Sequence, residues 1–147
     1  MSGGPGLPCL HASCVRWLGR GLLLLGPPGR GKSDLLLRLL EAGADLVADD
    51  LVELEVRNGR LAARPKAEPG LVELRGQGLF RLPALTSQPV HLLVDCRQRL
   101  VERLPEPVLE PLLGVALPRI VLACREASAL ARLRTVLLAA PIATGSA

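Results

Sequence analysis

Aromatic residues are nearly absent from this sequence. Trp17 and Phe80 are the only two among 147 residues, there is no tyrosine, and the aromatic content is 1%. Proteins that bind single-stranded nucleic acid stack the bases on aromatic side chains, which are too few here to form such a platform. The net charge of +4 comes from scattered rather than clustered arginines, so it indicates only a modest attraction to anionic partners. We therefore expect no nucleic-acid partner.

Long apolar runs are missing as well. No run approaches the ~20 residues that a membrane-spanning helix needs, and residues 1–5 lack the basic and apolar regions of a secretory signal. Cys9, Cys14, Cys96 and Cys124 form no C-x-x-C pair. A metal site made of these cysteines is therefore not favoured, and we expect buried thiols in a reducing compartment. Together these absences predict a cytoplasmic protein that does not bind a membrane.

Lysine is also scarce, because Lys32 and Lys66 are the only lysines among 18 basic residues. Lys32 lies in residues 26–33, Gly-Pro-Pro-Gly-Arg-Gly-Lys-Ser, which fit the phosphate-binding pattern G-x-x-x-x-G-K-[ST] at every fixed position. An apolar run at 22–25 precedes this loop and a helical pattern follows it, which is the order that the motif requires. A dinucleotide site is less favoured, because Asp34 replaces the third glycine of G-x-G-x-x-G.

Each residue type in this phosphate-binding loop, or P-loop, suits a nucleoside triphosphate. The glycines let backbone N–H groups approach phosphate oxygens, and the positive end of the following helix adds to the attraction. Lys32 is placed to reach the outer phosphates, and Ser33 is placed to bind a magnesium ion. The predicted nucleotide-binding residues are Gly26, Pro27, Pro28, Gly29, Arg30, Gly31, Lys32 and Ser33.

The length predicts one compact domain, with a flexible segment at 1–8 and a disordered tail at 139–147. We expect residues 80–89 to be turn-rich and mobile, and residues 98–114 to be partly helical. The predicted helices run from the P-loop to Gly43 and over 127–138, and the predicted strands are 11–17, 22–25, 44–48, 51–56, 61–64, 71–74, 91–94 and 120–123.

Two acidic sites could serve a phosphoryl-transfer reaction. Asp49 and Asp50 follow an apolar strand, and in an extended backbone neighbouring side chains point to opposite sides. One carboxylate could then face an acceptor hydroxyl while the other faces magnesium. Asp95, at the end of the strand 92–94, is the alternative, and it offers a metal ligand without a partner base. Taken alone, the Asp49-Asp50 pair could also be a solvated turn.

Three further polar residues are weaker candidates. Glu73 lies at the end of an alternating strand, where it could simply be an exposed strand residue. His11 and His91 lie in strand-like runs, where histidines are more often structural than catalytic.

Taken together, these motifs resemble the C-terminal catalytic domain of HPr kinase/phosphorylase, a bacterial regulator that phosphorylates a serine of the phosphocarrier protein HPr. The resemblance covers roughly residues 9–138 and depends on the order and spacing of His11 and of residues 26–33, 46–50 and 72–78. It implies a P-loop domain similar to that of phosphoenolpyruvate carboxykinase. That fold is α/β, with a mixed sheet and few helices.

The resemblance also implies a role for each candidate residue. Asp49 looks like the carboxylate that accepts the seryl proton, and that returns it when inorganic phosphate attacks phosphoserine. Lys32 would contact the β and γ phosphates of ATP, and His11 resembles a histidine near the reacting phosphate. The implied magnesium ligands are Ser33, Asp50 and Glu73.

The sequence departs from the family at two places. Pro28 stands where the family commonly has serine, so the reverse, phosphorylase reaction has less support than the kinase reaction. Residues 125–128 stand where long members carry Gly-Arg-Asn, and the chain looks like a short form without the N-terminal domain. The expected partner is an HPr-like phosphocarrier protein, with ATP and Mg²⁺, and homo-oligomer formation stays open. The alternatives are a kinase of another acceptor and a nucleotide-binding sensor without turnover.

Overall fold

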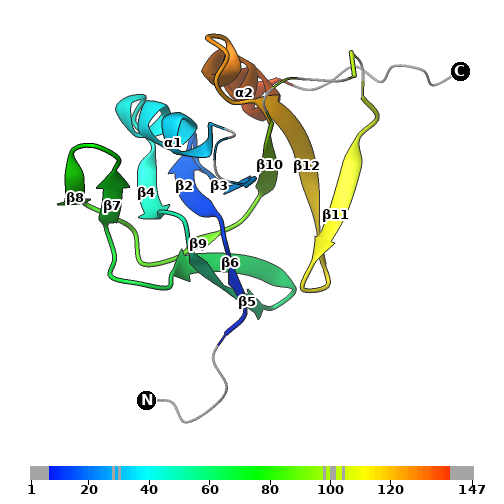
Figure 1. Cartoon of the computed structure of the whole chain (residues 1–147). Helices are drawn as coiled ribbons and strands as arrows, with labels where there is room; N and C mark the ends of the chain where they lie inside the picture. The colour runs from blue at the N-terminus through cyan, green and yellow to red at the C-terminus, as the bar shows by residue number, and fades with distance from the viewer. Residues whose placement is uncertain are drawn as a thin grey trace, which may run out of the picture.

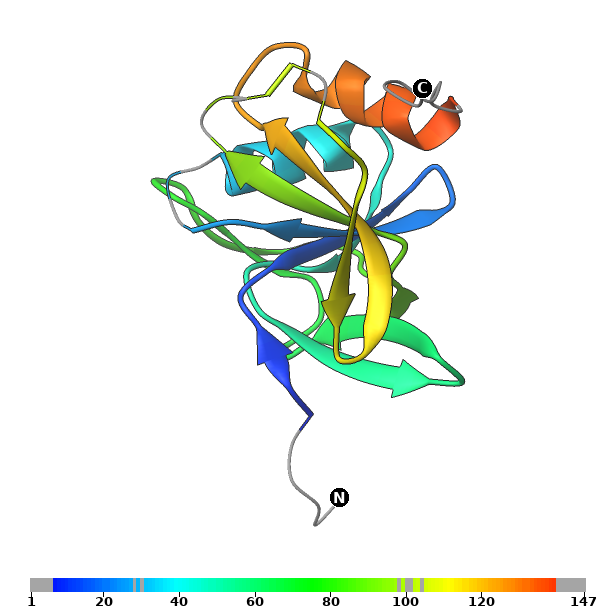
Figure 2. The ribbon, with the colours of Figure 1, turned by 90° about the vertical axis from the view of Figure 1, so that its right-hand side faces the viewer.

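The computed structural model describes residues 7–27, 29, 31–97, 99, 102–103 and 105–139. The chain forms an α/β domain in which both helices lie on the same face of a mixed sheet (Figures 1 and 2), so the predicted fold class is confirmed. The elements are β1 (Cys9–Leu10), β2 (Ser13–Trp17), β3 (Arg20–Leu25), α1 (Lys32–Glu41), β4 (Asp45–Ala48), β5 (Val52–Arg57), β6 (Arg60–Pro65), β7 (Leu71–Leu74), β8 (Gly78–Arg81), β9 (Gln88–Pro89), β10 (Leu92–Arg97), β11 (Val108–Leu112), β12 (Val115–Ala123) and α2 (Ala129–Leu138).

The main sheet has six strands in the order β11-β12-β10-β3-β2-β4. Strands β3, β10 and β12 are parallel, while β2 is antiparallel to both β3 and β4. Strand β4 therefore runs in the same direction as β3. The carboxyl ends of β3, β4, β10 and β12 consequently lie at one edge of the sheet, which is where α/β proteins usually bind ligands.

After the exposed Arg20, strand β3 is apolar because both of its faces are buried. Leu22 and Leu24 face α1 and α2 in one core cluster. Leu23 faces the opposite cluster, which includes Leu54 and Leu61 of the smaller sheet β1-β5-β6-β9. The P-loop therefore extends from a strand that is packed from both sides.

Helix α1 lies where the sequence predicted a helix after the P-loop, and it buries Leu35, Leu36 and Leu39. It ends in a Schellman turn at the predicted glycine, Gly43, where the Ala44 N–H donates to the Leu39 carbonyl at 2.9 Å. In the part of the chain that is described, both helices have ten residues, and neither is long and apolar enough to cross a membrane.

The predicted hairpin around Asn58-Gly59 is also present. Both residues have positive φ, 52° and 75°, as a two-residue type I′ turn requires, and they join β5 to β6. This hairpin forms the centre of the smaller sheet, with β1 and β9 at its edges.

The prediction of helix within residues 98–114 was wrong. The described residues of this range include β11, an edge strand that pairs with β12, and they include no helix. An edge strand can contain a proline such as Pro111, because its unpaired side needs no N–H donor. The last strand begins at Val115 rather than at Ile120. The range 80–89, which was expected to be turn-rich, contains the end of β8 and all of β9.

Several smaller predictions can also be compared with the structure. Cys14, Cys96 and Cys124 are buried as expected, but Cys9 is exposed, so the prediction was wrong for that residue. The flexible ends predicted at 1–8 and 139–147 fall mainly on residues 1–6 and 140–147, which lie outside the described part of the chain.

Close contact between β3 and β9 leaves no room for a side chain at Gly21. A Cβ atom at this position would lie 1.9 Å from the carbonyl oxygen of Pro89. We expect Gly21→Ala to lower the free energy of unfolding by about 2 kcal/mol or more, because the overlap is with backbone that must move. Urea denaturation measures this effect, and an unchanged transition midpoint would contradict the prediction.

Candidate active site

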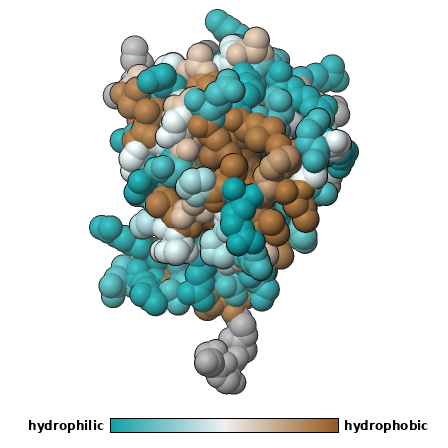
Figure 3. Space-filling model, turned by 90° about the vertical axis from the view of Figure 1, so that its left-hand side faces the viewer, coloured by the Kyte–Doolittle hydropathy of each residue, from teal (hydrophilic) through white to brown (hydrophobic). Residues whose placement is uncertain are grey.

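A cavity of about 530 Å³ lies at the carboxyl ends of β3 and β4. The P-loop, the end of β4, the segment 65–71 and the β7–β8 hairpin line it. The hairpin lies beside β4 and α1 at the left of Figure 1. The face that carries these elements has an apolar surface at its centre (Figure 3). Leu37, Leu79, Phe80 and Leu82 are the large exposed apolar residues of α1 and of residues 78–82.

Gly31 gives the P-loop its close approach to the start of α1. Its φ is 90°, and a Cβ atom here would lie 2.7 Å from Cγ of Arg125. The Gly31 carbonyl accepts the N–H of Leu35 at 2.9 Å, which is the first hydrogen bond of the helix. Pro28 and Arg30 lie outside the described residues.

Lys32 and Ser33, at the end of the P-loop, both line the cavity. Lys32 is only 8% exposed, and its Nζ lies 3.5 Å from Oδ1 of Asp50. Ser33 is exposed toward the cavity in the first turn of α1. A cation and a hydroxyl group therefore lie together where the outer phosphates of a bound nucleotide would be expected.

Asp49 and Asp50 also line this cavity, but their backbone is not extended as predicted. They form a bend after β4, and Asp50 has a φ of 69°. Because of the bend, both carboxylates face the same cavity instead of pointing to opposite sides of a strand. The prediction that the two carboxylates serve a single site remains consistent with this geometry.

Ser13 holds the bend, and the sequence reasoning missed it. Its side chain is fully buried at the start of β2, and its Oγ donates to Oδ1 of Asp49 at 3.2 Å. The same oxygen accepts the N–H of Asp50 at 3.0 Å. A serine within an otherwise apolar strand two residues after His11 was the available signal, but only the pairing of β2 with β4 shows what it contacts.

Burial raises the pKa of Asp49 above that of an ordinary aspartate. Hydrogen bonds from Ser13 and from the backbone of Glu73 partly oppose this change, the charge of Asp50 adds to it, and Lys32 opposes it. A carboxylate with a raised pKa is a stronger base than an exposed one, so Asp49 is suited to accept and return a proton.

The donor set of the cavity fits a divalent cation. Five carboxylates and three cationic side chains line it, so the negative charges exceed the positive ones by two before a nucleotide enters. Asp50 and Glu73 are exposed to the cavity, although no preformed metal cluster of three such ligands occurs among the described residues. Mg²⁺ usually takes only one or two carboxylates and completes its shell with phosphate and water. The predicted ligands Ser33, Asp50 and Glu73 therefore fit this ion.

The two histidines differ in their positions. Nδ1 of His91 accepts the N–H of Gly21 at 2.8 Å, which gives His91 the structural role expected for it. Burial lowers the pKa of His91, and the charges of Arg20 and Arg60 lower it further, so the neutral acceptor form is favoured. His11 is exposed in the bend between β1 and β2, and it is not among the residues that line the cavity. Its assignment to the reaction stays a prediction.

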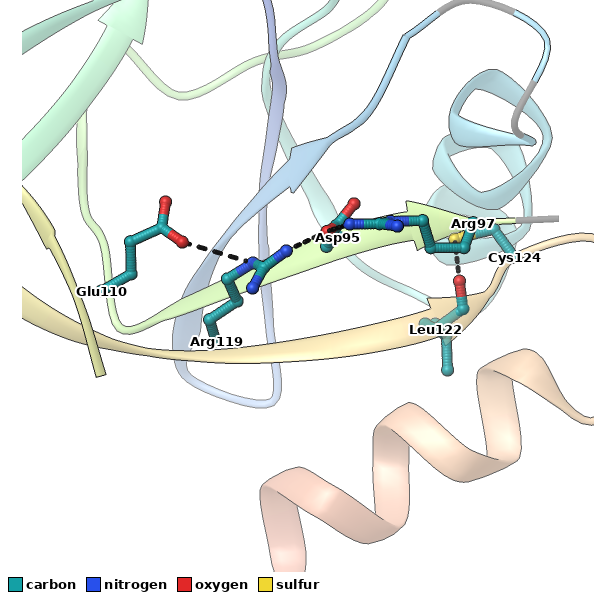
Figure 4. Close-up of polar contacts among 6 residues, drawn as sticks. All are labelled: Asp95, Arg97, Glu110, Arg119, Leu122 and Cys124. Carbon is teal, nitrogen blue, oxygen red and sulfur yellow. Dashed lines mark hydrogen bonds and ion pairs between the residues drawn. The ribbon is translucent and has the colours of Figure 1, made fainter. Parts of the chain in front are cut away.

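Asp95, the alternative acidic candidate, belongs to an ion-pair network outside the cavity (Figure 4). Arg97 donates to its Oδ2 at 2.7 Å, Arg119 donates to the same oxygen, and Arg119 also contacts Glu110 at 3.3 Å. Burial alone would raise the pKa of Asp95, but the two arginines outweigh it and lower that pKa. The geometry thus favours Asp49 and Asp50 over Asp95 as the acidic residues of this site.

Most of the residues that form this cavity belong to a stretch that matches a known protein family. The family model described as the HPr Serine kinase C-terminal domain matches residues 8–87, which is more than half of the chain. The chain belongs to this family. The matched range contains the P-loop, the Asp49-Asp50 bend and the β7–β8 hairpin, so it contains the parts that line the cavity.

Similar proteins carry the same family name. An HPr kinase/phosphorylase of Leptothrix cholodnii is 37% identical over 128 residues, which are 77% of this chain and 39% of that protein. An HPr kinase/phosphorylase of Clostridium tetani is 39% identical over 77 residues, which are 52% of this chain and 25% of that protein. The chain therefore spans less than half the length of these curated relatives.

A solved structure supports the same relationship. The HPr(Ser) kinase/phosphatase from Coxiella burnetii superimposes with a TM-score of 0.74 at 25% sequence identity. The superposition covers 89% of this chain and 88% of that chain. The resemblance in fold thus extends beyond the matched range 8–87 to most of the chain.

Proposed function

We propose that this domain is an ATP-dependent serine kinase that phosphorylates HPr or an HPr-like phosphocarrier protein. The observation that carries the proposal is that Asp49, whose pKa is raised, lies in the same cavity as Lys32 and Ser33 of a complete P-loop. The names of the relatives support the acceptor class. ATP and a carrier protein also agree with the cytoplasmic location that the sequence predicts.

In the proposed reaction each of these side chains has a role. The seryl oxygen attacks the γ phosphorus of ATP, the new O–P bond forms, the bond to the β-phosphate oxygen breaks, and ADP leaves. Asp49 takes the seryl proton. Lys32 balances the negative charge of the β and γ phosphates. Mg²⁺, held by Ser33, Asp50 and Glu73, would neutralise further phosphate charge, which is the main requirement of phosphoryl transfer.

We propose that the same residues can also remove the phosphate by phosphorolysis. An oxygen of inorganic phosphate would attack the phosphorus of phosphoserine, the bond from that phosphorus to the seryl oxygen would break, pyrophosphate would form, and Asp49 would give its proton to the seryl oxygen. The pKa of Asp49 is raised, so the protonated form that this direction needs is more accessible than for an exposed aspartate.

The surface around the cavity supports a protein acceptor over a small molecule. Leu79 lines the cavity and is 66% exposed, and Phe80 on the next position of β8 is 43% exposed. Exposed apolar side chains that gather on one surface are a feature of protein-interaction sites. A seryl side chain could enter the cavity while the surface around it rests on the β7–β8 hairpin.

The direct test is the intact mass of HPr after incubation with this chain, Mg²⁺ and ATP, with Asp49→Asn as the control variant. We expect a gain of one phosphate, located on serine by peptide mapping and absent with the variant. An unchanged mass, with ATP binding measured separately, would contradict the proposed acceptor. That result would favour a different acceptor or a sensor that binds nucleotide without turnover.

A further inference from the structure

Arg125 lies beside the P-loop although it is far from it in the sequence. It follows the carboxyl end of β12, it is exposed, and it lines the cavity together with Gly31, Lys32 and Ser33. Its Cγ atom lies where a side chain at Gly31 would otherwise be, 2.7 Å from the Cβ position. The Arg125 side chain therefore packs directly on the last glycine of the loop.

Helix α1 fixes the turn that carries Arg125. The guanidinium of Arg38 donates to the carbonyl oxygens of Cys124 at 3.1 Å, Glu126 at 3.3 Å and Ala127 at 3.1 Å. These three carbonyl groups surround Arg125 in the chain. Because Arg38 belongs to the helix that begins at the P-loop, Arg125 is held in a defined position relative to the nucleotide pocket.

The charge of Arg125 is not neutralised by any carboxylate in the described part of the chain. No carboxylate oxygen there lies within 4.0 Å of its guanidinium, whereas Arg38 pairs with Asp34 at 3.7 Å and Lys32 with Asp50 at 3.5 Å. A guanidinium group presents a planar set of donors that matches phosphate oxygens. Arg125 thus brings a guanidinium without a carboxylate partner to the P-loop cavity, on a backbone segment that Arg38 holds in place, and an anionic ligand would complement its charge.

We propose that Arg125 contacts the γ phosphate of bound ATP and stabilises the charge that develops on it during transfer. Lys32 would then approach the phosphates from the P-loop side and Arg125 from the end of β12. This inference rests on the proposed function, because it assigns a further residue to the same reaction. Arg38 acts as a positioning residue for Arg125.

Nucleotide binding tests this contact without any acceptor protein. In Arg125→Ala, the affinity for a non-hydrolysable ATP analogue should fall at least about 10-fold, because a hydrogen bond to a charged group is lost. The affinity for ADP should stay within about twofold, since ADP lacks the γ phosphate. Equal losses for both nucleotides, or no loss, would overturn the proposed contact, and this result is independent of whether HPr is the acceptor.

Transfer rates test the catalytic part of the proposal. At saturating ATP, Arg125→Ala should slow phosphorylation of HPr at least about 100-fold, which is modest for a cis arginine in phosphoryl transfer. Arg125→Lys should recover only part of this loss, because the charge returns without the planar fork. Added guanidinium ion should raise the rate of the alanine variant. A wild-type rate in Arg125→Ala would overturn the catalytic role.

Arg57 provides the matched control. It lies at the end of β5, its side chain is 75% exposed, and it does not line the cavity. Arg57→Ala should keep both the ATP-to-ADP affinity ratio and the transfer rate of the wild type. If the wild type binds ATP but labels no HPr, the proposed acceptor fails while the affinity ratio still decides the role of Arg125.

Discussion

Replacing Asp49 by asparagine should slow phosphoryl transfer at least about 100-fold while ATP affinity stays within about twofold, because a general base contributes about 10² to 10⁴ in rate. Asparagine keeps the oxygen that accepts the Ser13 hydroxyl, so the bend should survive. It cannot take the seryl proton. Single-turnover transfer to HPr and equilibrium nucleotide binding measure the two effects separately.

The pH dependence of the same reaction provides a second measurement. The raised pKa of Asp49 lies above the 3.8 of an ordinary aspartate, so the kinase rate should fall as the pH drops through it. The reverse reaction, which needs the protonated acid, should change in the opposite direction. The residual rate of Asp49→Asn should no longer show this pH dependence. If the pH dependence persists in the variant, it belongs to another group.

The stability of the variant separates loss of the base from misfolding. The pKa of Asp49 is higher in the folded chain than in the unfolded chain. Asp49 therefore contributes to the free energy of unfolding at a pH below its unfolded pKa, and this contribution is lost as the pH rises through its folded pKa. At a pH above the folded pKa, the wild type has lost this contribution. The uncharged Asp49→Asn should then be at least as stable as the wild type in urea denaturation.

Asp45 is the matched control for Asp49. It lies at the start of the same strand, β4, and its carboxylate pairs with Arg16 at 2.8 Å on the surface. Asp45→Asn should leave transfer unchanged. A wild-type transfer rate in Asp49→Asn, or an equal loss in both variants, would remove Asp49 from the mechanism.

The parts of this site that could be predicted from the sequence are local. The P-loop depends on eight consecutive residues, and their types determine how the loop and the first turn of α1 fold. The same holds for the hairpin at Asn58-Gly59 and for the helix end at Gly43. In each case neighbouring residues determine the backbone, so the order of residue types is sufficient.

The parts that the sequence did not reveal depend on pairing between distant segments. Ser13 and Asp49 are separated by 36 residues, and they meet because β2 pairs with β4. Arg125 reaches Gly31 because the parallel strands β3, β10 and β12 bring their carboxyl ends together. Strand β11 was missed because prolines make its pattern irregular, and its pairing with β12 is what keeps it extended.

Lys32→Ala should weaken nucleotide binding and transfer together, in contrast to Asp49→Asn. The Lys32 ammonium is buried beside Asp50, and it would meet the phosphates both before and during transfer. Loss of one charged contact should lower ATP affinity at least about 10-fold. The value of kcat/KM should fall further, because the carboxylates of the cavity then lack the positive charge that lies nearest to them.

Lys66 is the matched control, since it is the only other lysine in the chain. It pairs with Glu53 at 3.7 Å and does not line the cavity, so Lys66→Ala should behave as the wild type in both measurements. Lys32 also lowers the pKa of Asp49, and its removal should shift the acidic limb of the residual rate to higher pH. Wild-type ATP affinity in Lys32→Ala would contradict the role of Lys32 at the outer phosphates.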